Sequence, residues 1–198
     1  MGDEIFSADE RWETLFESER FSQRYLVEGL RMWTESVALI DAEPDPIAAA
    51  LRGPWDWWHK GRYENRVELD GGRIRYDLWP VGKSRMVHVR ETMAPTRELT
   101  AGARRIELEL EHHANGLAYF EIRPRRDGSS CDLIGRFDGA EIAGALPRLM
   151  SARRFAVNHL LAERGAMSFP FPPGTGWVGL IERLESRRPE RAGEDADR

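Results

Sequence analysis

Cysteine, net positive charge and long apolar runs are scarce in this sequence. Among its 198 residues there is one cysteine, Cys131, which excludes an intrachain disulfide. The formal net charge of −5 gives no electrostatic reason to expect a nucleic-acid partner, because phosphate binding requires a cationic face. No stretch approaches the roughly 20 apolar residues that cross a bilayer, and no N-terminal apolar run resembles a signal peptide. We therefore expect a soluble, cytoplasmic protein with no nucleic-acid partner and no membrane span.

Motifs for nucleophilic catalysis and phosphate binding are also absent. There is no Gly-x-Ser-x-Gly elbow, and Cys131 has no local catalytic signature. No glycine-rich turn joins a strand to a helix with the spacing of a phosphate-binding loop. We therefore assign no catalytic residue and expect no cofactor.

Three histidines lie among alternating segments that also carry carboxylates. His88, His112 and His113 stand near Glu109 and Glu111, and imidazole and carboxylate are ordinary zinc ligands. Adjacent residues of a strand point to opposite faces, so His112 and His113 cannot both reach one ion without a distorted backbone. We interpret these histidines as surface residues and predict no metal site.

Aromatic residues, by contrast, are abundant. The chain has 7 Trp and 8 Phe, which supply large contact areas to a core or a pocket. A hydrophobic share of 41% and a charged share of 32% are ordinary for a globular protein. The length fits one domain with a substantial core.

The N-terminal segment has the features of a helical arm over residues 1–33. Ser7 and Glu10 have the spacing of a capping box, which marks the start of a helix. Apolar residues then recur at spacings of three to five, which is typical of one bent helix or two in succession: Trp12, Leu15, Phe16, Phe21, Tyr25, Leu26, Leu30 and Trp33. This arm packs either on its own domain or on a second subunit, and a homodimer through it is possible.

A short strand and a short helix follow the arm. Residues 36–40 are β-like, and the prolines at 44 and 46 prevent the strand from continuing. Pro46 suits the first turn of a helix. Residues 46–52 are good helix formers that end at Gly53.

Six segments with period-two alternation come next, which predicts an antiparallel meander. They are residues 63–69, 73–78, 86–90, 105–111, 118–123 and 131–137. The first two are separated by Asp70-Gly71-Gly72, whose glycines can adopt positive φ. With exceptions such as Met86 and Ile134, each segment has one apolar and one polar face, so one side of the sheet must be covered.

The expected cover is a long helix over residues 140–166. It has Leu146, Leu149, Met150, Val157, Leu160 and Leu161 at helical spacing. Residues 169–177 are too rich in proline to be regular, and residues 178–184 form a short amphipathic piece. From residue 187 the chain is charged, and we expect it to be disordered. Residues 167–198 are thus an extension and a tail.

This order of elements resembles the START-like superfamily, also called the polyketide cyclase and lipid-transport, SRPBCC or helix-grip superfamily. Residues 37–46 are similar to the family's first strand running through prolines into a short helix. Trp55, Trp57 and Trp58 stand where the family often has tryptophan, and the C-terminal helix completes the resemblance over residues 34–166. It implies that a hydrophobic or amphipathic small molecule binds between sheet and helix. Some members convert that molecule, so the resemblance leaves the use of the pocket open.

The sequence thus predicts an α+β, helix-grip fold, with a curved antiparallel sheet of about seven strands wrapped around a long C-terminal helix and an extra N-terminal helical arm. Asn65 and Tyr76 are the main polar side chains that the apolar faces carry toward the pocket, where sparse polar groups usually orient a ligand. The candidate ligand-binding residues are Trp58, Asn65, Tyr76, Leu78, Val87, Val89, Phe120, Leu133, Met150 and Val157.

Three functions fit these patterns. The favoured one is binding or transport of a hydrophobic or aromatic small molecule in the apolar pocket. The first alternative is a polyketide cyclase/dehydrase-like enzyme that positions a flexible substrate, with Tyr76 as an acid. The second is an interaction protein that uses the N-terminal helical arm.

Overall fold

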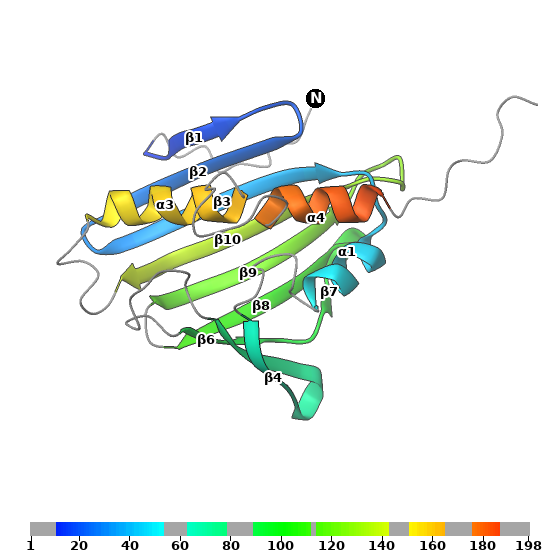
Figure 1. Ribbon diagram of the computed structural model, residues 1–198. Helices are drawn as coiled ribbons and strands as arrows, with labels where there is room; N and C mark the ends of the chain where they lie inside the picture. The colour runs from blue at the N-terminus through cyan, green and yellow to red at the C-terminus, as the bar shows by residue number, and fades with distance from the viewer. Residues whose placement is uncertain are drawn as a thin grey trace, which may run out of the picture.

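A single antiparallel sheet organises the protein. The computed structural model describes residues 11–53, 63–78, 89–111, 114–142, 151–164 and 176–186. The strands are β1 (Glu13–Glu17), β2 (Phe21–Glu28), β3 (Arg31–Ile40), β4 (Tyr63–Leu69), β5 (Arg73–Leu78), β6 (Val89–Met93), β7 (Arg97–Glu98), β8 (Arg104–Glu111), β9 (Ala114–Pro124) and β10 (Cys131–Ile142). They are ordered β1-β2-β3-β10-β9-β8-β6-β5-β4, with β7 paired to β8. Figure 1 shows the curved sheet with helices on one side.

Five of the predicted meander strands are present as β4, β5, β8, β9 and β10. The strand predicted over residues 86–90 overlaps β6 at residues 89 and 90, since β6 runs to Met93 and residues 86–88 lie outside the described residues. The turn between β4 and β5 is the short 3₁₀ segment η2 (Asp70–Gly72), where Gly71 and Gly72 both have φ of 71°. A second such segment is η3 (Thr100–Gly102). The described sheet has ten strands instead of the predicted seven, because β7 and two N-terminal strands add to it.

The helical interpretation of the N-terminal arm is wrong for residues 13–33, which form β1, β2 and the start of β3. β2 and β3 pair around a two-residue turn in which Gly29 has φ of 60°. Both faces of β2 are buried, since Tyr25 is 4% and its neighbour Leu26 is 9% exposed. Apolar residues on both faces obscure the period-two alternation and mimic helical spacing. The predicted capping box lies outside the described residues.

The predicted short helix is present as α1 (Pro44–Leu51). Its prolines occupy the first positions of the helix, where no backbone donor is needed. Ile47 and Leu51 are fully buried, and α1 packs against β8 and β9.

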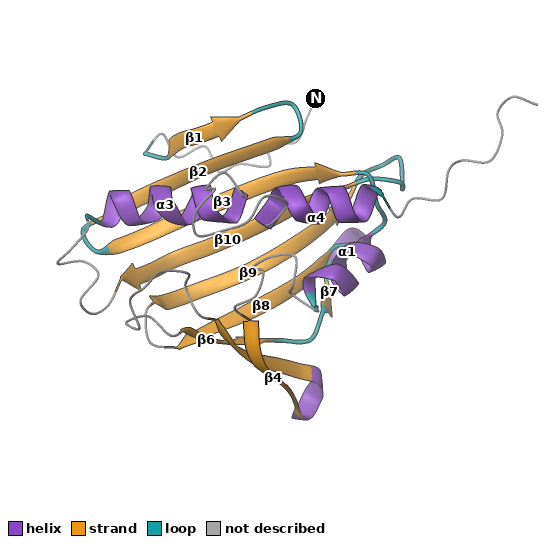
Figure 2. Ribbon diagram, viewed as in Figure 1, coloured by secondary structure: helices purple, strands orange, loops and turns teal. Residues whose placement is uncertain are grey.

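The C-terminal helix is shorter than predicted. β10 continues to Ile142, so residues 140–142 are a strand, and the helices described after it are α3 (Ala152–Arg164) and α4 (Gly176–Glu185). α4 confirms the amphipathic piece predicted over residues 178–184. Figure 2 shows that α3 and α4 lie along the same side of the sheet, near β2, β3 and β10. Residues 143–150, 165–175 and 187–198 lie outside the described part of the chain.

The core lies between this side of the sheet, which we call the inner face, and the helices. A large cluster joins α1 and α4 to the inner side chains of β3, β5, β6, β8, β9 and β10. A smaller cluster joins α3 to Tyr25 and Met32. The domain boundary expected between residues 33 and 34 therefore falls inside β3, and α4 of the expected extension contributes buried residues to the main core.

Candidate binding site

A row of apolar residues crosses the inner face. Phe137, Ala118, Leu108, Met93 and Ile74 are successive Cα partners on β10, β9, β8, β6 and β5. Directly opposed residues of neighbouring strands point to the same face, so the row forms one surface. At one end, the Phe137 ring meets the His159 ring of α3 edge-on, with 4.6 Å between centroids. The row therefore runs from beneath α3 toward β5.

Trp177 of α4 fills the middle of the inner face. It is 1% exposed, and its ring packs against Phe120 and Phe21 with centroid distances of 6.2 and 5.6 Å. Beneath it lies Gly135 of β10, where a Cβ atom would stand 2.7 Å from Cζ2 of Trp177. The missing side chain thus provides the room in which the indole lies against the sheet.

The described candidate residues occupy different surroundings. Tyr76, Phe120 and Leu133 belong to the main core cluster, and Val157 packs with the smaller cluster under α3. Asn65 is exposed and has φ of 54° beside an irregularity of β4. The expectation that Asn65 and Tyr76 share the polar content of a buried pocket is therefore wrong, because the irregularity breaks the alternation of β4.

Two further candidates lie on neighbouring strands, and the others lie outside the described residues. Leu78 and Val89 are Cα partners of β5 and β6, which places their backbones side by side. Trp58, Val87 and Met150 lie outside the described residues, as do His88, His112 and His113. In the part of the chain that the structure describes, no group of histidine, cysteine, aspartate and glutamate side chains could hold a metal ion.

A polar cluster that sequence reasoning missed lies between β2, β3 and α3. Gln23 is fully buried and donates hydrogen bonds of 3.0 Å to Ser36 Oγ and to the carbonyl oxygen of Leu160. Ser36 Oγ lies 3.4 Å from Glu163 Oε2, and His159 Nε2 lies 2.9 Å from Glu163 Oε1. The prediction of a helical arm over residues 1–33 concealed this cluster, because Gln23 lies on the face toward α3 as a residue of strand β2.

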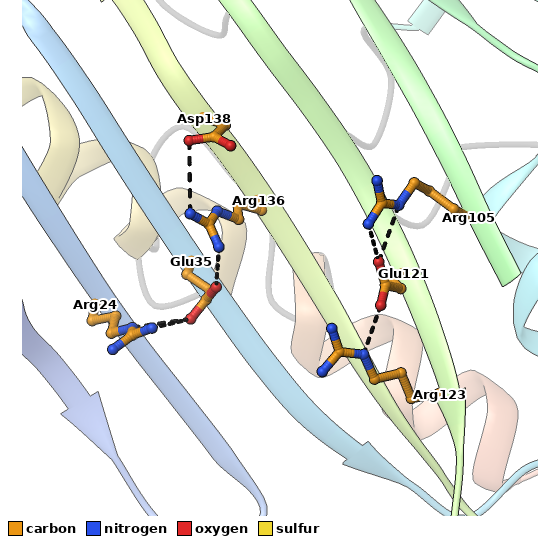
Figure 3. Close-up of polar contacts among 7 residues, drawn as sticks. All are labelled: Arg24, Glu35, Arg105, Glu121, Arg123, Arg136 and Asp138. Carbon is orange, nitrogen blue, oxygen red and sulfur yellow. Dashed lines mark hydrogen bonds and ion pairs between the residues drawn. The ribbon is translucent and has the colours of Figure 1, made fainter. Parts of the chain in front are cut away.

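The opposite, outer face carries two buried carboxylates, each bound by two arginines (Figure 3). Glu35 accepts hydrogen bonds from Arg24 at 2.9 Å and from Arg136 at 3.3 Å. Glu121 accepts them from Arg105 at 3.0 Å and from Arg123 at 2.6 Å. Each carboxylate is fully engaged by arginines of its own or neighbouring strands, so we interpret these groups as sheet-stabilising contacts and not as a ligand site.

The balance of forces on Glu121 agrees with this interpretation. Burial of the carboxyl opposes its ionisation, but hydrogen bonds from Arg105 and Arg123 outweigh burial and hold the pKa of Glu121 below its ordinary value. A carboxylate that is both ionised and bound in this way is unsuited to proton transfer near neutral pH.

Cys131 provides a test of the core. It is fully buried, and burial together with the charge of Asp132 raises the pKa of its thiol to about 11. At about pH 8 the thiolate fraction is then about a thousandth, against a substantial fraction at the unperturbed pKa of about 8.5. We expect a disulfide reagent such as DTNB to label the native protein at least about 100-fold more slowly than the urea-unfolded protein. Rapid, stoichiometric labelling of the native protein would contradict this burial.

Comparison with known proteins supplies the fold family. No protein-family model matches the sequence, and neither does any curated protein. The structure is similar to human StAR-related lipid transfer protein 5 (TM-score 0.52, 9% identity, 89% of each chain). It is also similar to the human StarD13 lipid transfer and protein localization domain (TM-score 0.58, 12% identity, 90% of this chain and 89% of that one).

A third similar structure is bacterial. It is the STAR-related lipid transfer protein of Xanthomonas axonopodis, with a TM-score of 0.50, 11% identity and coverage of 78% of this chain and 98% of that one. Among the described helices of our protein, none is long and apolar enough to cross a membrane. The order of the strands, the helices on one side of the sheet and these three likenesses agree, and the chain therefore has the START-like, helix-grip fold.

Proposed function

We propose that the protein binds a hydrophobic or aromatic small molecule against the inner face of β5, β6, β8 and β9. The observation that carries this proposal is the extent of the apolar row beyond the C-terminal helices. α3 packs on β2 and β3, and α4 packs on β3, α1 and α3, with its Trp177 reaching Gly135 of β10 and Phe120 of β9. Leu108, Met93 and Ile74 continue the apolar surface toward the far side of the sheet. Binding on this surface would remove apolar surface of the ligand from water, which favours the complex by about 25 cal/mol for each Å² removed.

The chemistry of this surface favours binding over reaction. Its described members are Ile74, Tyr76, Met93, Ile106, Leu108 and Ala118, a set that contains a single hydroxyl. One phenol can orient a ligand, whereas acid–base catalysis also needs a group to accept the proton. The similarity to lipid-transfer proteins agrees with the proposal. The interaction alternative depended on a helical arm, and we do not propose it because residues 13–17 and 21–28 are strands.

Enlarging Ala118 tests the proposal. Ala118 is 1% exposed and lies between Phe137 and Leu108 in the apolar row. If a ligand occupies the space over it, Ala118→Leu fills that space. We expect a loss of at least about tenfold in affinity for a neutral apolar dye such as Nile red, with unfolding free energy changed by less than about 1 kcal/mol. Fluorescence titration and urea denaturation measure the two quantities.

Ala38→Leu is the matched control. Ala38 is also fully buried, but it lies on β3, where α4 packs. There the added methyl groups meet protein, and we expect a destabilisation of about 1 to 3 kcal/mol. If Ala118→Leu destabilises the protein as much as Ala38→Leu and dye binding is undetectable in the wild type, the inner face is a packed core and the proposal fails.

A further inference from the structure

Gln23 leaves one buried polar atom without a partner. Its amide group donates to Ser36 Oγ and to the carbonyl oxygen of Leu160. A carbonyl oxygen can only accept, so the amide nitrogen must face Leu160, and this fixes the position of Oε1. Among the described residues, Oε1 has no hydrogen-bond partner although Gln23 is fully buried. A buried acceptor of this kind calls for a donor from outside the described residues.

Arg164 leaves an unpaired cation in the same region. It ends α3 one turn after Leu160, and its Cζ lies 4.2 Å from the ring centroid of Phe16. Phe16 is the Cα partner of Gln23, so the ring on which the Arg164 guanidinium stacks belongs to the residue beside Gln23 in the sheet. Within the described chain, the buried Nη1 atom has no hydrogen-bond partner, and Arg164 has no carboxylate partner.

The neighbouring acid does not neutralise Arg164. Glu163 Oε1 lies 2.9 Å from His159 Nε2, and Glu163 Oε2 accepts a hydrogen bond from Ser36 Oγ at 3.4 Å. Burial lowers the pKa of Arg164, with no countercharge to oppose it. A guanidinium remains protonated even so, and it binds phosphate or carboxylate oxygens through paired N–H groups. The site therefore presents one charged hydrogen-bond donor, the Arg164 guanidinium, and one neutral hydrogen-bond acceptor, Gln23 Oε1.

We propose that Arg164 and Gln23 bind a small oxyanion that carries its own O–H, namely a hydrogenphosphate or phosphate monoester group. The anionic oxygens accept from the Arg164 guanidinium, and the P–OH group donates to Gln23 Oε1. Sulfate has a similar shape and charge but no O–H at neutral pH, so the Gln23 carbonyl oxygen would face a sulfate oxygen. The site is separate from the apolar surface over β5 to β9 and does not depend on it.

Isothermal titration with inorganic phosphate and with sulfate at constant ionic strength tests this site. At about pH 6.5 every inorganic phosphate ion carries at least one O–H, whereas a phosphate monoester, whose second pKa is about 6, carries an O–H in only part of its population. We expect phosphate to bind the wild type at least about tenfold more tightly than sulfate. Arg164→Gln should weaken phosphate binding by at least about tenfold. Arg154→Gln removes the same charge from an exposed position of α3 and should leave binding unchanged.

The Gln23→Met variant tests the acceptor, and it should bring the affinities for phosphate and sulfate together. Octyl phosphate distinguishes the two sources of the group, because tighter binding than inorganic phosphate identifies a phosphate head group on a hydrophobic chain. The proposal is overturned if sulfate binds the wild type as tightly as phosphate, or if neither anion binds. It is also overturned if Arg164→Gln and Arg154→Gln weaken binding equally. The comparison of phosphate and sulfate affinities for the wild type tests the proposal even if a variant fails to fold. The apolar surface is tested separately by dye binding to the Ala118→Leu variant, so failure of one proposal does not imply failure of the other.

Discussion

Replacing Gly135 with alanine is expected to destabilise the protein by about 3 kcal/mol, at the upper end of the range for overpacking a core. This loss of stability is opposite to the usual effect of the substitution, because Gly135 does not have the left-handed backbone that disfavours alanine. In a strand without such a requirement, a change from glycine to alanine ordinarily stabilises by about 0.4 to 1 kcal/mol through the unfolded chain. The expected loss must therefore come from the contact with Trp177.

The geometry leaves the new methyl group no space. It would lie 2.7 Å from Cζ2 of Trp177 and 3.2 Å from Cε1 of Phe120. The indole is held between the sheet and the rest of α4, with 1% of its surface exposed, so it cannot rotate away without moving α4. Urea denaturation should show a lower midpoint at an unchanged slope, and a thermal scan should show a fall of about 6 to 12 °C.

A double-mutant cycle with Trp177→Leu isolates the contact. Trp177→Leu alone removes buried volume and should cost about 3 kcal/mol or more. In that background the clash is gone, so Gly135→Ala should cost less than about 0.5 kcal/mol, giving a coupling free energy of about 2 to 3 kcal/mol. Equal costs of Gly135→Ala in both backgrounds would show that Trp177 is not what excludes a side chain at position 135.

Replacing Glu35 with glutamine should have an effect of similar size on the opposite face of the sheet. The Glu35 side chain is 4% exposed, and its two partners Arg24 and Arg136 are 11% and 24% exposed. The indole of Trp12 covers both guanidinium groups, with their Cζ atoms 4.6 and 5.7 Å from its ring centroid. Removing the central charge leaves two poorly hydrated cations side by side, and we expect a loss of about 3 kcal/mol in unfolding free energy.

Glu28→Gln provides the control for this prediction. Glu28 also pairs with an arginine of the N-terminal region, Arg11, but their side chains are 49% and 62% exposed. An exposed pair is worth about 1 kcal/mol or less and weakens in salt. The effect of Glu35→Gln should persist in high salt, since its partners are shielded from the solvent. If the two substitutions lower the urea midpoint equally, the Glu35 network does not stabilise the sheet.

The meander could be read directly from the sequence because its strands differ on their two faces. In β8, for example, Ile106 and Leu108 are buried on the inner face while Glu109 is exposed. Such alternation has one structural interpretation, and a helix would scatter these residues around its axis. The prolines before α1 and the glycines of η2 were equally local signals.

The N-terminal strands could not be read in this way. β2 is covered on the inner face by α3 and partly on the outer face by Trp12, so buried residues stand at adjacent positions. The loss of alternation is a consequence of packing by segments far away in sequence. The prediction that Asn65 faces the pocket was wrong for a local reason: Asn65 lies within the irregularity between Glu64 and Val67, where the alternation of β4 is interrupted.

The sequence by itself determined the antiparallel meander, the short helix after the first strand and the START-like resemblance, because each depends on periodicity or on backbone preferences of a few neighbouring residues. Tertiary structure alone decided the face of Gln23, the place of Trp177 over Gly135 and the approach of Arg164 to Phe16. These contacts join residues more than 40 positions apart. Their partners are chosen by strand order and helix placement, which no local pattern specifies.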